Sequence, residues 1–305
     1  MLLFTGMLIA QPNCQYGKAN ITVTSGNITQ HLSTSGAMLT DGSGNAAYQI
    51  KVNDQLVPII YEGGIWLGGR TLADDVRFSG ATYVVAGSDY TDWYPGVLDP
   101  DYNLTNPCKN WDRFFILTYK DIQNAIQMLY NSNGTINTVD CDSLPPNVLA
   151  WPGKGNPYFK NVNGFDLPNM YAIPFYDYNT DGIYDPCAGD LPMFQAKEVV
   201  VNNHLDVLNT FPDHLSLSII NDALGPHNLS GGEPAQVEIH QYAFDYHSLD
   251  SLEQTTFYLY KIINKSESAL NHSYFGMWFD PDLGCYLDDY GGCSAVNNLI
   301  YFYNT

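Results

Sequence analysis

One acidic stretch, DYNTDGIYDPCAGD at 177–190, places oxygen-bearing side chains at the spacing of a calcium-binding loop. Calcium takes about six to eight oxygen ligands, and alternate side chains on a tightly turning loop supply them. Positions 1, 3, 5, 6 and 9 of that pattern are filled by Asp177, Asn179, Asp181, Gly182 and Asp185. The predicted ligands are the side chains at positions 1, 3 and 5, the backbone carbonyl of Ile183, and Asp185 directly or through water.

The same stretch lacks what a helix–loop–helix calcium switch requires. Position 12, where such a loop carries a bidentate Glu, is Ala188. Pro186 stands where the exiting helix would begin, and another proline interrupts the entering segment YAIPFY, so neither flanking helix is expected. The sequence therefore predicts a static calcium loop, closed by Asp190 or by a distant residue. An Asx-rich turn without metal is the alternative.

A second acidic cluster lies in WFDPDLGCYLDDYGGC, which contains Asp280, Asp282, Asp288 and Asp289. Carboxylates this close in sequence must be solvated, hydrogen-bonded or neutralised by a cation. A second metal site is therefore a candidate here, although the spacing matches no standard calcium loop. Paired carboxylates also act as acid and base in glycoside hydrolysis, which keeps a polysaccharide-degrading hydrolase as an alternative function.

Histidines and glutamates between residues 225 and 247 form a weaker candidate, a transition-metal site. Its members would be His227, Glu233, Glu238, His240 and His247. Strand histidines are more often ordinary hydrogen-bond partners, and the chain contains no HExxH motif. It also lacks GxSxG, SxxK and a phosphate-binding glycine loop. We therefore predict no catalytic residue and no organic cofactor, and we expect that the chain is not an enzyme.

The charge balance narrows the class of partner. Among 305 residues, Lys and Arg number 12 and Asp and Glu 32, which gives a formal net charge of −20. Such a surface repels phosphate backbones and anionic membranes, so no nucleic acid partner and no membrane insertion are expected. It attracts cations, which agrees with calcium, although an acidic surface also serves solubility alone.

Most of the chain reads as β-structure. Short apolar or Thr-rich runs alternate with Gly, Asn and Asp, and PAQVEIHQYAFDYH alternates between two faces. We predict a mostly β, antiparallel sandwich of jelly-roll type with long loops. One helix is expected near 119–131, because apolar residues recur there at helical spacing and Thr118 with Asp121 resembles a capping box.

The domain organisation follows the same patterns. One β-rich subdomain with the helix is predicted over 19–165, and a second with the acidic loop over 166–305, the two packed together. The chain stops within an apparent strand, NNLIYFYNT, which indicates a fragment of a longer protein. The apolar run MLLFTGMLIA at 1–10 resembles the hydrophobic part of a secretory signal, and a buried first strand is the alternative.

Six cysteines occur without a CxxC pair, which disfavours zinc and thioredoxin-like sites. In an exported protein they are expected to form disulfides. Cys285 and Cys293 bracket a short loop, and Cys108 and Cys141 flank the predicted helix. These are the two pairings that spacing favours, although spacing alone does not fix connectivity.

Several stretches, taken in order, resemble the N-terminal region of large secreted cell-surface proteins of Bacteroidota, which typically end in a type IX secretion sorting domain. The resemblance covers about residues 20–305. It rests on GGIWLGGR, YTDWYPGVLD, WDRFFILTYKDI, LAWPGKGNP, DYNTDGIYDPCAGDLP, GPHNLSGGEPAQVEIHQYAFDY, YLYKIINKS and GMWFDPDLGCYLDDYGGC. It implies an exported, multi-domain protein with an all-β body and a calcium-type loop at 177–185. It carries over no catalytic residue, and the sorting domain is not in this chain.

Together these patterns predict a secreted, calcium-stabilised β module of a bacterial cell-surface protein, with a structural, adhesive or ligand-binding role. The expected partners are other domains of the same longer chain, and glycans or surface proteins. Besides the hydrolase, a non-catalytic carbohydrate-binding module is an alternative, because tryptophans and tyrosines in GIWLGG, DYTDWYPG and SYFGMWFD suit a sugar-stacking face.

Overall fold

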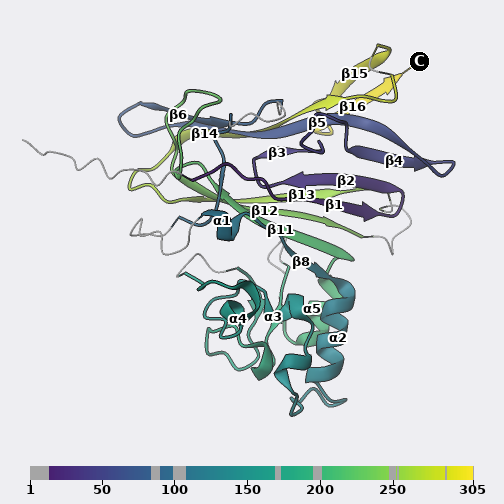
Figure 1. Ribbon diagram of the computed structural model, residues 1–305, viewed down its shortest axis with the longest axis vertical. Coiled ribbons are helices and arrows are strands. Elements are labelled where there is room, and N and C mark those ends of the chain that lie inside the picture. The colour runs from purple at the N-terminus through teal and green to yellow at the C-terminus, as the bar shows by residue number, and fades with distance from the viewer. Residues whose placement is uncertain are drawn as a thin grey trace, which may run out of the picture.

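The computed structural model describes residues 14–83, 90–98, 108–168, 173–194, 201–246, 252, 254–285 and 287–304. In these ranges two antiparallel β-sheets pack together, and a lobe of short helices and loops lies beyond the second sheet (Figure 1). The predicted mostly β, antiparallel sandwich-like fold is thereby confirmed. The predicted signal segment at 1–10 lies outside the described residues.

The first sheet is built around one long strand, β5 (Gln55–Arg70). Its second half pairs antiparallel with β14 (Asn271–Pro281), which arrives from the far end of the sequence. The remaining strands of this sheet are β1 (Asn20–Ser25), β2 (Ile28–Ser33), β3 (Ala37–Met38), β4 (Tyr48–Val52) and β6 (Val76–Gly80).

Glycines inside β5 allow aromatic rings of β14 to cross it. A Cβ on Gly63 would lie 2.8 Å from the ring of Phe279, and one on Gly64 would lie 2.7 Å from the indole of Trp278. Real Cβ atoms are not found so close, so a side chain at either position would push the rings away. The glycines of GGIWLGG therefore serve close packing within a strand.

The central strands of the second sheet, β11 and β12, are buried on both faces. Its strands are β13 (Phe257–Asn264), β12 (Val237–Asp245), β11 (His214–Asn221), β7 (Tyr94–Pro95) and β8 (Phe115–Thr118). Side chains alternate between the faces along β12, as its sequence predicts. Val237 and Ile239 pack against Ile65 of the first sheet, whereas Tyr242 and Phe244 face the helical lobe.

Both sheets combine strands from either side of residue 165, where the boundary between two subdomains is predicted. β5 pairs with β14, and β8 pairs with β11, where Leu117 lies opposite Leu215. The lobe core likewise mixes residues from both parts of the chain, such as Leu117 and Leu191.

The predicted helix is confirmed as α2 (Tyr119–Leu129). Thr118 accepts a hydrogen bond from the backbone N–H of Asp121, whose side chain accepts one from the Thr118 N–H in return. The sequence predicted one helix, but the structure contains further short helices, which the prediction missed: α1 (Cys108–Trp111), α3 (Pro146–Leu149), α4 (Phe159–Asn163) and α5 (His204–Thr210). Segments of four to seven residues are too short to display helical periodicity.

Two small hairpins complete the described fold. β9 (Phe175–Tyr176) pairs with β10 (Leu191–Pro192) in the lobe. β15 (Asp289–Ser294) pairs with β16 (Leu299–Asn304), and this hairpin extends beyond the first sheet (Figure 1). No helix within the described ranges is long and apolar enough to cross a membrane.

Both disulfide pairings favoured by spacing were wrong. Cys108 pairs with Cys14, and Cys141 pairs with Cys187, each with a Cα–Cα distance of 5.7 Å. Cys285 and Cys293 are exposed free thiols. Tertiary contacts decide these pairings: Cys14 packs in the same cluster as Cys108, and Cys293 belongs to a strand that pairs with β16. Disulfide formation itself was predicted correctly.

Candidate functional site

The acidic loop runs from the end of β9 to the start of β10, so the two-stranded ladder closes its base. Its first carboxylate organises the turn. Asp177 accepts the backbone N–H of Asp181 at 3.2 Å and that of Gly182 at 2.8 Å. Asn179 also accepts from the Asp181 N–H, at 3.1 Å, and Asp181 accepts from the Ile183 N–H at 2.8 Å. The predicted ligands at positions 1, 3 and 5 therefore lie on one tight turn.

Two backbone positions with positive φ make this turn possible. Thr180 has φ of +60° and Gly182 has φ of +75°. Glycine adopts such angles without the penalty that a Cβ imposes. The side chains of Asn179 and Asp181 are exposed on this turn, Asp177 is half-buried, and Ile183 is 45% exposed.

Asp190 holds the loop from inside the protein through hydrogen bonds; whether it also closes a calcium site, as the sequence predicts, stays a prediction. It is fully buried, and its carboxylate accepts the N–H of Tyr178 at 2.8 Å and the N–H of Asp185 at 2.7 Å. Burial raises the pKa of Asp190 to about 6, the two backbone N–H groups oppose this, and the charges of Asp177 and Asp181 raise the pKa further. Three carboxylates of the loop therefore interact electrostatically.

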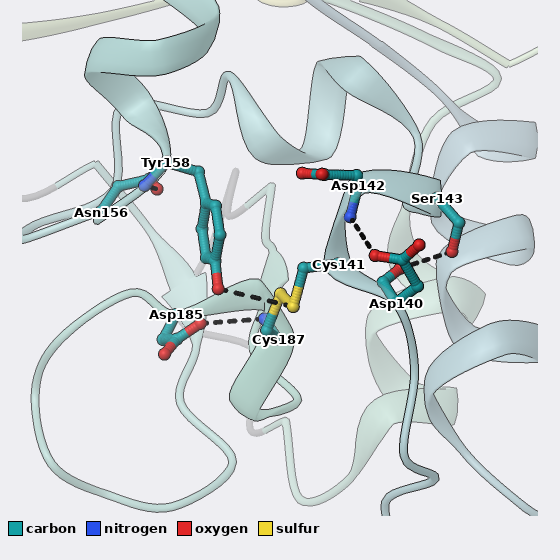
Figure 2. The surroundings of a disulfide bond; sticks show 8 residues. All are labelled: Asp140, Cys141, Asp142, Ser143, Asn156, Tyr158, Asp185 and Cys187. Carbon is teal, nitrogen blue, oxygen red and sulfur yellow. Dashed lines mark hydrogen bonds between the residues drawn. A yellow bond between two sulfur atoms is a disulfide. The ribbon is translucent and has the colours of Figure 1, made fainter.

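Asp185 contributes mainly to local structure. Its carboxylate accepts the N–H of Cys187 at 2.9 Å and caps the short 3₁₀ helix Pro186–Ala188 (Figure 2). Cys187 is bonded to Cys141, and the hydroxyl of Tyr158 donates to the Cys141 sulfur at 3.4 Å. The far side of the acidic loop is thus fixed covalently to the segment that follows α2.

Tyr184 fixes the middle of the loop in the lobe core. Its ring is fully buried, its hydroxyl donates to the carbonyl of Val148 at 2.7 Å, and its N–H donates to the carbonyl of Lys154 at 2.7 Å. Gly153 makes room for the ring, because a Cβ there would lie 2.5 Å from it. The loop is therefore held at its base, its middle and its end while its first turn remains at the surface.

The donor set suits calcium in kind. Asp177, Asn179 and Asp181 each offer a side-chain oxygen as a metal ligand, and hard cations prefer oxygen. A carboxylate oxygen that accepts one N–H hydrogen bond still has a second lone pair for an ion. Within the described ranges, no three His, Cys, Asp or Glu side chains converge as a ready-made metal cluster. Asp177, Asn179 and Asp181 are the side chains on this turn that could hold an ion, and the Ile183 carbonyl and the Asp190 carboxylate are the further candidates.

The second acidic cluster is brought together only in part. Burial raises the pKa of Asp282, and the charges of Asp289 and Asp280 add to this effect. Asp280 accepts the hydroxyl of Tyr83 at 2.9 Å, and Asp289 accepts the N–H of Leu283 at 3.1 Å. The Oδ1 atoms of Asp282, Asp288 and Asp289 are shielded from solvent, and none of them accepts a hydrogen bond from a described residue.

Glu62, which sequence reasoning missed, faces this second cluster. It lies directly opposite Asp280 in the β5–β14 ladder and is fully buried. Residues 62 and 280 are brought together only by strand pairing, so no local pattern could have identified the contact.

The histidines do not form a common metal site among the described residues. Both ring nitrogens of His227 face backbone carbonyls, those of Phe78 at 3.0 Å and Asp222 at 2.7 Å. The buried His240 contacts Glu238 at 2.8 Å on the same strand. Glu233 instead pairs with Arg77 at 3.7 Å, and the candidate His247 lies outside the described residues.

Comparison with known proteins gives no further guide: no family model matches the chain, and neither a curated protein nor a solved structure is significantly similar to it. The resemblance to Bacteroidota surface proteins therefore stays a prediction.

Proposed function

We propose that this chain is a secreted β module of a bacterial cell-surface protein, stabilised by calcium and with a structural, adhesive or ligand-binding role. The observation that carries the proposal is the acidic loop, in which Asp177, Asn179 and Asp181 share one turn above the buried Asp190. A cation there would neutralise carboxylates that otherwise repel one another.

The disulfides support the extracellular part of the proposal. Such bonds persist in oxidising compartments and are rare in the cytosol. Calcium fits the same environment, because extracellular modules bind it with Kd values of about 10⁻⁴–10⁻³ M. The Cys141–Cys187 bond and the acidic loop lie in the same lobe, so a covalent and a metal cross-link would restrain the same irregular segments.

Calcium would act by ordering long loops. Fixing one residue of backbone costs about 1–2 kcal/mol in conformational entropy, and the lobe contains many residues outside helices and strands. Asp177, Asn179 and Asp181 would supply side-chain oxygens, and Ile183 its carbonyl. Ion binding to the folded state alone stabilises that state by mass action. The sandwich would then present its surfaces from a fixed platform.

Thermal unfolding of the full chain tests this proposal. We expect the midpoint to rise when EDTA is replaced by millimolar calcium, and we expect Asp181→Asn to remove that rise. Asn retains the oxygen that accepts the Ile183 N–H but lacks the charge. Glu267→Gln, which removes one charge from an exposed residue elsewhere, should respond to calcium as the wild type does. Equal midpoints in EDTA and in calcium would contradict the calcium role.

A further inference from the structure

A cleft of about 240 Å³ lies beside strands β1 to β3 of the first sheet, and no residue of the acidic loop lines it. Its lining comes from the chain around the start of β1, the region from the end of β2 to the turn after β3, the residues after β6, those before β7, and Leu229. Its volume is below the ~300–1,000 Å³ typical of sites for drug-sized ligands. It therefore suits a compact ligand or one unit of a larger chain.

Hydroxyl groups predominate among the polar side chains that line this cleft. Among them, the hydroxyls of Tyr16, Ser43, Thr82 and Tyr90 make no hydrogen bond with any residue that the structure describes. A hydroxyl both donates and accepts, so a wall of uncommitted hydroxyls matches a ligand that carries many hydroxyls of its own.

The cleft is also lined by aromatic rings. Tyr83 and Tyr90 are 52% and 68% exposed. Tyr83 is nevertheless fixed: its hydroxyl donates to Asp280 at 2.9 Å, and its ring packs edge-on against Trp278 with centroids 4.9 Å apart. An exposed ring held rigidly offers a flat apolar face at little entropic cost.

The backbone of this wall is braced from behind. The indole N–H groups of Trp66 and Trp278 both donate to the carbonyl of Ala81, each at 2.6 Å. Ala81 itself lines the cleft, next to Tyr83. Two tryptophans on neighbouring strands of the first sheet thus fix the position of the wall before any ligand binds, which lowers the entropic cost of binding.

The charges in the cleft indicate binding rather than cleavage. Asp41 is the only carboxylate among its described lining residues, whereas glycoside hydrolysis takes a pair. Asp41 is engaged in its own turn, because it accepts the N–H groups of Ser43 at 2.7 Å and Asn45 at 3.1 Å. Lys18 lies 4.9 Å above the ring of Tyr16, where its ammonium adds a donor for ligand oxygens.

We propose that this cleft binds a saccharide unit of a glycan, with Tyr83 and Tyr90 stacking on the sugar face and the surrounding hydroxyls bonding its hydroxyl groups. The proposal gives the ligand-binding role proposed above a specific site, and it rests on that role for its context. The acidic loop contributes no residue to the cleft. The calcium proposal and the saccharide proposal can therefore be tested, and refuted, independently of each other.

Affinity electrophoresis of the full chain tests the proposal, with gels that contain soluble β-glucan, xylan, galactomannan, pectin or alginate, together with a glycan array. At least one polysaccharide should retard the wild type. Tyr90→Ala should weaken that binding by about tenfold, since it removes one stacking ring. Ser43→Trp should abolish it by filling the cleft, because Ser43 is exposed and its side chain makes no bond with a described residue.

Tyr274→Ala is the matched control, since Tyr274 is 76% exposed on β14 and lies outside the cleft. It should bind as the wild type does, and circular dichroism should show that all variants are folded. The proposal is overturned if neither the gels nor the array detect binding. It is equally overturned if folded Tyr90→Ala and Ser43→Trp bind with unchanged affinity.

Discussion

The titration of Asp190 gives a signed prediction for the acidic loop. Its pKa in the folded chain is about 6, raised chiefly by burial and further by Asp177 and Asp181, against about 3.9 in an unfolded chain. A raised pKa means that the folded state binds the proton more tightly. The resulting stability is full below about pH 4 and is lost as pH rises through about 6. The shift of about two units corresponds to about 3 kcal/mol.

Urea unfolding in EDTA measures this effect when the wild type is compared with Asp190→Asn across the same pH range. The variant does not titrate at this position, and it loses one of the bonds to Tyr178 and Asp185 at every pH. The free energy of unfolding of the wild type minus that of the variant should fall by about 2 kcal/mol from about pH 4 to about pH 7, which is most of the full effect. A constant difference would refute the reasoning.

Calcium should change that comparison in a defined direction. A cation near Asp190 favours its ionised form, so in millimolar calcium the difference should fall less between about pH 4 and about pH 7 than it does in EDTA. An Asx-rich turn without metal predicts identical curves in the two solutions.

Two further variants test how the lobe is held. Replacing Cys141 and Cys187 together by Ser opens a cross-link between residues 46 apart and should lower the free energy of unfolding by about 4 kcal/mol in the chain-entropy model; an unchanged urea midpoint would count against it. Gly153→Ala places a Cβ 2.5 Å from Tyr184 and should cost about 1–3 kcal/mol, whereas Gly276→Ala, with open space around it, should cost much less in the same assay.

Features that depend on neighbouring residues could be predicted from the sequence. The helix α2 was predictable because Thr118 and Asp121 cap it locally and its apolar residues share one face. The two faces of β12 follow from strict alternation. The turn of the acidic loop was likewise recognisable, because Asp177 and Gly182 act within one short segment.

Features that depend on strand pairing could not be predicted. The position of Glu62 opposite Asp280 exists only through the β5–β14 register. The partner of Cys141 depends on where the loop around Cys187 is placed by its packing. The cleft beside Tyr83 combines segments that are far apart in sequence, so neither its hydroxyls nor its rings form a local pattern.

Direct titration of calcium into the metal-stripped chain at neutral pH tests the central claim most closely. A stabilising calcium loop predicts saturable binding with a Kd of about 10⁻⁴–10⁻³ M, lost in Asp181→Asn and retained in Glu267→Gln. The absence of saturable binding by the wild type, or equal binding by Asp181→Asn, would contradict the claim that the loop at 177–190 holds calcium.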